Sequence, residues 1–346
     1  MMRPRGQETS PLPQKGLAIA GAVTYNTIMP KTLVITGLLS PLGRSIARGA
    51  ADAGVRVLGV DTKPLTRPFP GVEFIQTDVR NALFPKLLQA EKVDAILHTA
   101  FRWRIRRSEQ VFESNVMGTM KLMGAAALAG IQKVVIPSST FVYGAYPAHP
   151  LFMSEETEFQ GRPRYAYIRD LRDIETFING FRRQYPEMTI TVLRFAHILG
   201  RGYPSPLGRY LSRVAAPTLL GYDPLMQVIH RDDALRALGI ALREDHDGVY
   251  NIAAPKPLYL SQMLRLSNTP AAPLLHPLAY KSFKWTRMLI KQVDALVPIP
   301  WDYLRYSLTV ATEKAEQELH FTPQHQSESI LRELATPAGG QQRDQG

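Results

Sequence analysis

The chain has 346 residues, of which 45% are hydrophobic, so it is long and apolar enough to bury a large core. It has no cysteine, which excludes disulfides, thiolate nucleophiles and cysteine-bound metals and is consistent with the reducing cytoplasm. The formal net charge of +11 would suit anionic substrates, an acidic membrane surface or nucleic acid. Because no DNA- or RNA-binding motif is present, we expect no nucleic-acid partner.

Residues 1–28 precede the first predicted strand. They are polar and rich in Pro and Gly, and their apolar piece, LAIAGAV, is too short to span a bilayer. We therefore expect residues 1–28 to be a disordered tail or an upstream mis-start before Met29.

The stretch 32–61 predicts a strand, a helix and a second strand. A short aliphatic run ends at Gly37, Pro41 suits the first turn of a helix, and Gly54 ends that helix. The second strand closes with Asp61. This order is typical of a dinucleotide-binding βαβ unit, in which helix N–H groups meet a pyrophosphate and the acid binds the ribose hydroxyls.

Asp61 also indicates which dinucleotide is bound. A carboxylate repels a 2′-phosphate, so the sequence favours NAD over NADP, although Lys63 and Arg44 could tolerate NADP. A βαβ unit that binds no nucleotide is the alternative interpretation.

Gly37, Ser40 and Gly43 occupy the three positions of a TGxxGxxG turn, which resembles the short-chain dehydrogenase/reductase superfamily. The middle position is Ser40, which has a side chain where the backbone should come closest to the phosphates. Either its hydroxyl binds a phosphate, or the cofactor lies less deeply.

The next segments continue the alternation of strands and helices. Strands are predicted over 72–76 and 93–98, and the end of the second one, LHTAF, resembles the family's HxAA segment. The basic loop FRWRIRR follows, with Arg102, Arg104, Arg106 and Arg107 beside Trp103. It could attract a phosphorylated substrate or be a solvated or interface loop.

The stretch 133–145, KVVIPSSTFVYGA, is predicted as the fifth strand. It resembles the SSxxxVYG segment of extended short-chain dehydrogenases, the NAD-dependent epimerase/dehydratase branch that includes UDP-glucose 4-epimerase. The resemblance implies that Ser139 binds the hydroxyl or carbonyl that reacts. It also implies that Asn115 is the family's active-site asparagine, which holds a helix kink and a proton-relay water.

The family's Tyr-x-x-x-Lys pair is altered here. Tyr165 follows Ser139 at a family-like spacing, but Arg169 stands four residues later in place of lysine. Arginine keeps the charge that lowers the tyrosine pKa, yet it has a wider fork and cannot relay a proton.

Beyond this pair, TVLRFAHILGRG resembles the family's LRxxNxxG segment. His197 stands where an asparagine commonly meets the substrate phosphate; a packed histidine is the alternative. Asp232 and Asp233 lie near a helix start and are interpreted as structural.

The resemblance covers residues 29–335. It implies an α/β fold, a Rossmann-type doubly wound parallel sheet with a smaller C-terminal substrate lobe. The NAD-binding core is expected over 29–195, with 228–255 returning to it, and the lobe over 196–227 and 256–335. Residues 336–346 are expected to be a disordered tail.

The lobe includes a predicted helical stripe with Trp285, Met288 and Leu289, accompanied by Lys281, Lys284, Arg287 and Lys291. Packing on the body of the protein is the favoured interpretation. Peripheral attachment to an anionic membrane is the weaker alternative.

Two functional classes follow. The first is a cytoplasmic NAD-dependent epimerase, dehydratase or dehydrogenase acting on a hydroxylated small molecule, with nucleotide sugars among the candidates; the second is a dinucleotide-binding sensor or assembly protein with impaired catalysis. No metal site is predicted, and a homodimer is one assembly that the sequence allows. The resemblance implies Ser139, Tyr165, Arg169 and Asn115 as catalytic and Ser139, Tyr165 and His197 as substrate-binding. It implies these cofactor-binding residues: Gly37, Ser40, Leu42, Gly43, Asp61, Asp78, Val79, His98, Thr99, Ala100, Tyr165 and Arg169.

Overall fold

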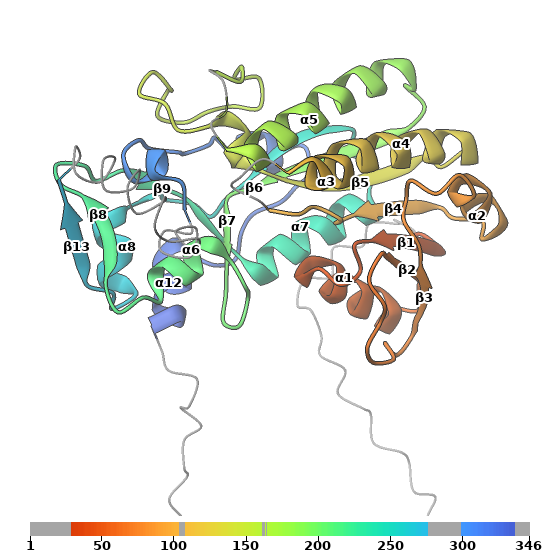
Figure 1. Ribbon diagram of the computed structural model, residues 1–346, viewed down its shortest axis with the longest axis horizontal. Helices are drawn as coiled ribbons and strands as arrows, with labels where there is room; N and C mark the ends of the chain where they lie inside the picture. The colour runs from red at the N-terminus through yellow and green to blue at the C-terminus, as the bar shows by residue number, and fades with distance from the viewer. Residues whose placement is uncertain (1–28, 104–107, 161–162, 164, 276–298, 336–346) are drawn as a thin grey trace, which may run out of the picture.

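A seven-stranded parallel sheet forms the centre of the molecule (Figure 1). The computed structural model describes residues 29–103, 108–160, 163, 165–275 and 299–335. The strand order is β11-β6-β5-β4-β1-β2-β3, and every pairing is parallel. The predicted doubly wound fold is therefore confirmed. The strands are β1 (Thr32–Thr36), β2 (Arg56–Asp61), β3 (Val72–Gln76), β4 (Ala95–His98), β5 (Lys133–Ser139), β6 (Thr189–Phe195) and β11 (Gly248–Ile252).

Helices cover both faces of this sheet and bury two apolar clusters against it. On one face, α1 and α7 contribute small residues such as Ala47, Ala50, Ala237 and Ala241, which let the helices lie close to the strands. On the other face, α2, α4 and α5 bury larger side chains such as Phe84 and Leu122. The helices are α1 (Pro41–Asp52), α2 (Phe84–Ala90), α3 (Glu109–Phe112), α4 (Gly118–Ala129), α5 (Ala166–Gln184) and α7 (Arg231–Arg243).

The strand order reverses between β1 and β4. The chain passes from β1 outward to β2 and β3, then returns to β4 on the other side of β1. Ligands of open α/β sheets bind at such a point, beyond the carboxyl ends of the strands. The topology therefore indicates the ends of β1, β2 and β4 as the place for a site.

Three small two-stranded sheets lie beside the large one, and all of their strands except β10 (Val228–His230) come from segments that the sequence assigns to the substrate lobe. Apolar residues of the helices in these segments, including Leu207, Tyr210 and Leu304, belong to the same buried cluster as Leu33 and Ile35 of β1. The division of the chain into core and lobe stays a prediction. The elements here are β7 (His197–Leu199), α6 (Pro206–Leu211), β8 (Ala216–Leu219), β9 (Leu225–Met226), β10 (Val228–His230), β12 (Leu258–Tyr259), α8 (Leu260–Leu266), β13 (Ala271–Leu274), η3 (Trp301–Leu304), α11 (Glu313–Gln317) and α12 (Ser327–Ala335).

Two predicted strands are shorter than expected. The fourth begins at Ala95 instead of residue 93. The fifth ends at Ser139, whose hydroxyl accepts a hydrogen bond from the Phe141 N–H and so starts the 3₁₀-helix η2 (Thr140–Tyr143). A side chain that bonds to the backbone two residues ahead competes with the sheet ladder, which explains why the strand stops there.

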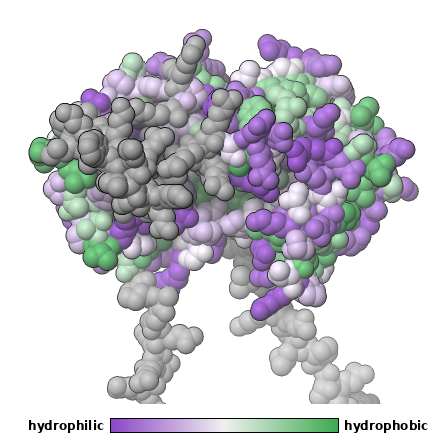
Figure 2. All heavy atoms as spheres, viewed as in Figure 1, coloured by the Kyte–Doolittle hydropathy of each residue, from purple (hydrophilic) through white to green (hydrophobic). Residues whose placement is uncertain are grey.

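Several predictions concern residues outside the described ones. These are the tails 1–28 and 336–346, Arg104, Arg106 and Arg107 of the basic loop, and the helical stripe within 276–298. Among the described helices, none is both long and apolar enough to cross a membrane. Figure 2 shows hydrophilic residues mixed with smaller hydrophobic areas over the described part of one face.

A buried ion pair ties α5 to the sheet. The Arg194 Nη2 atom of β6 lies 2.6 Å from the Glu175 Oε2 atom of α5, and the two side chains are 3% and 1% exposed. Arg194 Nη1 also donates to the Tyr143 hydroxyl, and the Ser138 hydroxyl donates to Glu175. The network joins β5, β6 and α5 at the carboxyl ends of the strands.

We predict that Arg194→Met lowers the free energy of unfolding by about 3 to 5 kcal/mol, because it leaves the Glu175 carboxylate buried without its cation. Urea denaturation followed by circular dichroism measures the change. The matched control is Arg56→Met, which breaks an exposed pair with Glu73 and should change stability little. Equal effects of the two substitutions would contradict the prediction.

Candidate functional site

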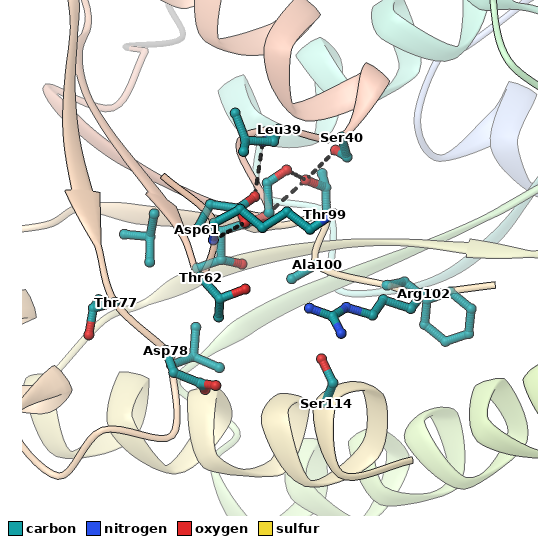
Figure 3. Close-up of a pocket in the computed structure, with 16 residues that line it drawn as sticks. Leu39, Ser40, Asp61, Thr62, Thr77, Asp78, Thr99, Ala100, Arg102 and Ser114 are labelled. Carbon is teal, nitrogen blue, oxygen red and sulfur yellow. Dashed lines mark hydrogen bonds between the residues drawn. The ribbon is translucent and has the colours of Figure 1, made fainter. Parts of the chain in front are cut away.

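A pocket of about 230 Å³ opens at the carboxyl ends of β1, β2 and β4, where the strand order reverses (Figure 3). It lies where a Rossmann-type fold binds its ligand. Some of the residues that line it were predicted from the sequence to bind the cofactor, and others were not. The predicted ones are Gly37, Ser40, Asp61, Asp78, Val79, Thr99 and Ala100, and the others include Leu39, Thr62, Lys63, Thr77, Phe101, Arg102 and Ser114.

The glycine turn packs directly on the segment that follows β4. Gly37 has a φ of +72°, and a Cβ there would lie 2.6 Å from the Ala100 Cα. A Cβ on Gly43 would lie 2.6 Å from the Gly37 carbonyl oxygen. Both positions therefore require glycine, and the requirement comes from the packing of the turn itself.

The Ser40 hydroxyl is used within the fold. It accepts a hydrogen bond from the Gly43 N–H at 3.0 Å, which caps α1, and it donates to the Thr99 hydroxyl at 2.9 Å. Thr99 donates in turn to the carbonyl oxygens of Thr36 and Gly37. The sequence indicated a phosphate contact or a shallower cofactor at Ser40, whereas this link between β1, α1 and β4 follows from no local pattern.

Asp61 stands at the end of β2 and faces the glycine turn. Its Oδ2 atom accepts from the Leu39 N–H and its Oδ1 atom from the Lys63 N–H, each at 3.1 Å. These bonds fix the carboxylate at the pocket and leave lone pairs on both oxygens for a ligand. The arrangement can bind a pair of neighbouring hydroxyl groups.

Asp78 is held by Arg80 at the opposite wall of the pocket. Arg80 donates to both carboxylate oxygens, at 2.8 Å from Nη2 and 3.0 Å from Nε. The hydrogen bonds from Arg80 hold the pKa of Asp78 below its usual range, so the carboxylate stays ionised. The neighbouring Val79 also lines the pocket.

Two predicted cofactor residues point elsewhere. The His98 ring lies inside the core between the Thr36 and Thr119 hydroxyls, at 2.6 and 3.0 Å. The Leu42 side chain packs against the apolar cluster on the α1 face. Either residue could therefore meet a cofactor only through its backbone.

Asn115 fastens the loop that carries Arg102. Its amide group accepts from the Arg102 N–H at 2.9 Å and donates to the Arg102 carbonyl oxygen at 3.0 Å. It also donates to Asp170 of α5 at 3.1 Å. Asn115 lies in the π-helix η1 (Glu113–Met117), which agrees with the helix kink implied by the resemblance. Both N–H groups of the side-chain amide are used in these bonds, so the side chain holds the loop to α5. The proton-relay water implied by the resemblance stays a prediction.

Arg102 and Ser114 were not selected as site residues from the sequence. Figure 3 shows the Arg102 guanidinium and the Ser114 hydroxyl pointing into the same part of the pocket. A signal for them was present, because Arg102 belongs to the basic loop and Ser114 precedes Asn115. Only the contact between these two segments indicates a shared pocket.

The predicted catalytic side chains lie beyond the pocket, toward α5. The Ser139 hydroxyl is buried and donates to the Phe195 carbonyl at 3.3 Å. Tyr165 is the N-cap of α5, and its carbonyl accepts the Arg169 N–H, so the two residues share the first turn. The Arg169 guanidinium lies 3.4 Å from the Asp170 carboxylate.

An aromatic cluster packs beside Tyr165. Tyr167 lies 6.4 Å from Tyr165 and 5.7 Å from Phe141, between ring centroids, and Trp103 packs on both Tyr167 and Phe141. Burial raises the pKa of Tyr167 well above its usual value, so this tyrosine stays neutral.

His197 is buried at the start of β7. Its ring meets the Phe141 ring edge-on at 4.9 Å, and among the described residues its Nε2 atom has no hydrogen-bond partner. Burial lowers its pKa to about 4, so the ring is neutral near pH 7. A buried nitrogen without a partner is costly, and a ligand atom would relieve that cost.

Comparisons with known proteins give consistent results. The model of the NAD dependent epimerase/dehydratase family matches residues 33–253. An uncharacterized protein of Mycobacterium tuberculosis is 31% identical over 255 residues, which are 71% of this chain and 68% of that protein. A UDP-glucose 4-epimerase of Azospirillum brasilense is 25% identical over 227 residues, 61% of this chain and 63% of the relative.

Solved structures show the same fold. The UDP-glucose 4-epimerase of Thermotoga maritima with UDP-glucose has a TM-score of 0.67 and 16% identity, covering 88% of this chain and 97% of the other. An epimerase from Stenotrophomonas maltophila with bound NAD and formylated UDP-arabinopyranose has a TM-score of 0.68 and 19% identity, with the same coverage. At these identities the likeness is one of fold.

The buried His98 predicts a pH dependence of stability. Burial lowers its pKa to about 4 in the folded chain, against about 6.5 when unfolded. Below pH 6.5 the unfolded chain therefore binds a proton that the folded chain accepts only near pH 4. The contribution of His98 to the free energy of unfolding is therefore greatest above pH 6.5. It decreases by about 3 kcal/mol as the pH falls to 4.

We expect His98→Gln to remove the part of the stability loss at low pH that comes from His98. The part that comes from His197, whose pKa burial lowers in the same way, should remain. Urea denaturation at several pH values between 7 and about 4 measures the slope. An unchanged slope in the variant would show that His98 is not protected from protonation.

Proposed function

The chain belongs to the NAD-dependent epimerase/dehydratase family, and from this premise we propose that it is an enzyme that binds NAD(H) and acts on a nucleotide-linked sugar. The reaction class is hydride transfer at a hydroxyl-bearing carbon, leading to epimerisation, dehydration or oxidation. The relatives and neighbouring structures that bind UDP-sugars support this substrate class.

The observation that carries the proposal is the carboxylate of Asp61 at the pocket. The backbone N–H groups of Leu39 and Lys63 hold it, so it does not have to be ordered when the cofactor binds. Its remaining lone pairs would accept the two ribose hydroxyls of NAD(H). A 2′-phosphate at the same place would meet a negative charge, which supports NAD over NADP.

The pyrophosphate would lie at the N-terminus of α1. The first N–H groups of a helix have no acceptor within the helix and attract anions. Since Pro41 has no N–H and Ser40 caps Gly43, the Leu42 N–H is the group that we propose for this contact. Arg102, whose backbone Asn115 holds, would add positive charge from the other side of the pocket.

Tyr165 is the proposed acid and base. A hydroxyl proton of the substrate would pass to the tyrosinate, and Arg169 is the cation on the same helix turn that would stabilise this charged form. Ser139 would donate its hydrogen bond to the substrate oxygen after leaving the Phe195 carbonyl. NAD(H) bound at the pocket would supply the hydride acceptor and donor.

His197 is the proposed contact for the substrate diphosphate. Its buried Nε2 atom could donate one hydrogen bond to a phosphate oxygen, as a neutral group without adding charge. The basic character of the chain suits such an anionic substrate.

A dinucleotide-binding protein with impaired catalysis is the second candidate. The specific observation in its favour is the contact of Arg169 with Asp170, since the carboxylate offsets the charge that would lower the tyrosine pKa. The hydrogen bond from the Ser139 hydroxyl to the Phe195 carbonyl also favours this candidate, because it occupies the hydroxyl. Both candidates require the same cofactor pocket and differ only in chemistry.

We predict that Asp61→Ala weakens NADH binding by about 1.5 to 3 kcal/mol, because hydrogen bonds from the ribose to a charged acceptor are lost. Calorimetry of NADH and NADPH on both proteins measures this. The unmodified protein should prefer NADH, and the variant should lose that preference. Because Asp61 also holds Leu39, a thermal melt of the variant checks that the turn stays folded. Tighter NADPH binding by the unmodified protein would refute the assignment.

For the chemistry, we expect Tyr165→Phe to abolish turnover while NADH binding stays nearly unchanged. General acid and base groups contribute about 10² to 10⁴-fold in rate, so the loss should be of this size. Arg169→Lys should keep or raise activity, because lysine restores the pair typical of the superfamily. Nicotinamide absorbance with a panel of nucleotide sugars follows the reaction.

The same panel separates the two candidates. Unchanged turnover in Tyr165→Phe would remove the assignment of the acid and base. An absence of turnover in all variants, together with intact NADH binding, would favour the binding protein.

A further inference from the structure

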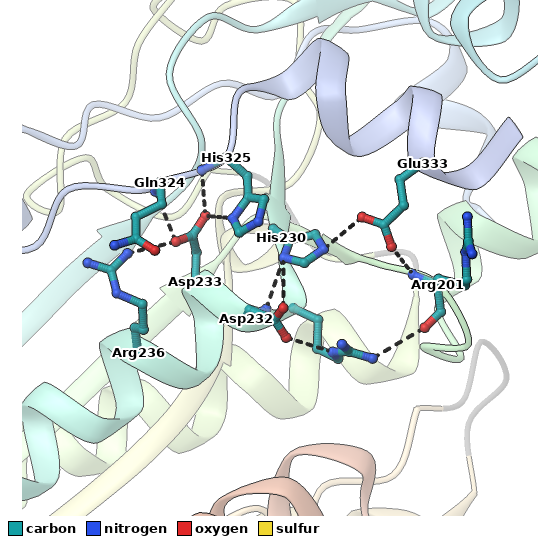
Figure 4. Close-up of polar contacts among 9 residues, drawn as sticks. Arg201, His230, Asp232, Asp233, Arg236, Gln324, His325 and Glu333 are labelled. Atoms are coloured by element: carbon teal, nitrogen blue, oxygen red, sulfur yellow. Dashed lines mark hydrogen bonds and ion pairs between the residues drawn. The ribbon is translucent and has the colours of Figure 1, made fainter. Parts of the chain in front are cut away.

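A second polar cluster lies where the C-terminal segment meets the start of α7, and no step of the proposed reaction uses it (Figure 4). It consists of His230, Asp232 and His325, surrounded by Asp233 and Glu333. His230 and Asp232 belong to the start of α7, whereas His325 lies just before α12. We call His230, Asp232 and His325 the two-histidine cluster.

The hydrogen bonds of His230 define which of its ring nitrogens carries the lone pair. Its Nε2 atom lies 3.0 Å from the Glu333 carboxylate, which also accepts the Arg201 N–H at 2.8 Å. A carboxylate only accepts, so Nε2 carries the proton and Nδ1 carries the lone pair. The Asp232 N–H approaches this Nδ1 at 3.2 Å, a long bond that a stronger partner could replace.

His325 repeats the pattern. Its Nδ1 atom lies 2.8 Å from the Asp233 carboxylate, which is fully buried and also accepts the N–H groups of Gln324 and His325. Nδ1 is therefore the donor, and the Nε2 atom carries the lone pair. The two rings stack with centroids 3.9 Å apart.

Asp232 completes the cluster. One of its oxygens accepts from Arg231, and the other lies 3.7 Å from the Nδ1 atom of His230. One ligand atom from each of His230, Asp232 and His325 lies within 4.8 Å of the other two. Two imidazole rings and a carboxylate thus lie close enough together to share one cation.

We propose that the two-histidine cluster binds a divalent transition metal, of which zinc is the first choice, and that the metal fastens the C-terminal segment to α7. Two imidazoles and one carboxylate suit zinc, cobalt or nickel, whereas magnesium and calcium prefer oxygen ligands alone. The outer carboxylates Glu333 and Asp233 would hold both rings in the correct tautomer, as is usual around metal-bound histidines.

The surroundings allow entry and supply charge. Asp232 is exposed and His325 is partly exposed, so a metal and a fourth ligand from water can reach the place from solvent. The N-terminal end of α7 and the guanidinium groups of Arg231 and Arg236 repel a cation, and three carboxylates offset this, those of Asp232, Asp233 and Glu333. The side chains must rotate toward one another on binding, because zinc holds nitrogen and oxygen ligands at about 2.0 to 2.2 Å.

The test uses the full-length protein, freed of metal with EDTA and titrated with ZnCl₂ by calorimetry. The absorption spectrum of the protein with CoCl₂ reports the coordination directly, and MgCl₂ is the negative control. We expect one zinc per chain, a higher melting temperature with zinc and no response to magnesium. Asp232→Asn and His325→Gln should each remove zinc binding, and Glu333→Gln should weaken it by about 10 to 100-fold.

The matched control is His320→Asn, which removes an exposed imidazole outside the cluster at a left-handed position that asparagine tolerates. It should bind zinc like the unmodified protein. No zinc binding by the unmodified protein overturns the proposal, and so does binding unchanged in Asp232→Asn and His325→Gln. Because Asp232 is exposed, its variant should fold and carries the test alone if the His325 variant does not.

Discussion

The close approach of the Gly37 turn to the backbone of Thr99 and Ala100 is the constraint on which the rest of the site depends. It brings the carboxyl ends of β1 and β4 into contact at the point where the strand order reverses. No side chain fits between them, so hydroxyls at the edges make the remaining links, from Ser40 to Thr99 and from Thr99 to the turn carbonyls.

The two ends of the site are built in different ways. The pocket end uses backbone groups and short side chains held by neighbours, as with Asp61 on Leu39 and Asp78 on Arg80. Such groups are ordered before a ligand arrives, which reduces the entropy cost of binding. At the α5 end, Ser139 bonds to the protein itself, so the role proposed for it would require an exchange of hydrogen-bond partners.

Asn115 and Asp170 connect these two ends. The Asn115 amide holds both backbone groups of Arg102 and reaches Asp170, which in turn contacts Arg169. The loop at the pocket and the start of α5 are thus joined through two buried side chains, those of Asn115 and Asp170. The sequence indicated Asn115 by resemblance, but its partners follow no local pattern, since Asp170 lies 55 residues farther along the chain.

The sequence by itself determined the features that depend on neighbouring residues. These are the alternating strands and helices, the glycine positions of the first turn, and Asp61 at the end of β2. Periodicity, positive φ and the end of a strand are local properties, so they can be predicted from adjacent residues. Only the tertiary structure decided how the polar side chains are used. Ser40 bonds to Thr99, 59 residues away, and His98 turns into the core toward Thr36, 62 residues away. Hydrogen bonds of this kind depend on which distant segments the fold brings within 3 Å.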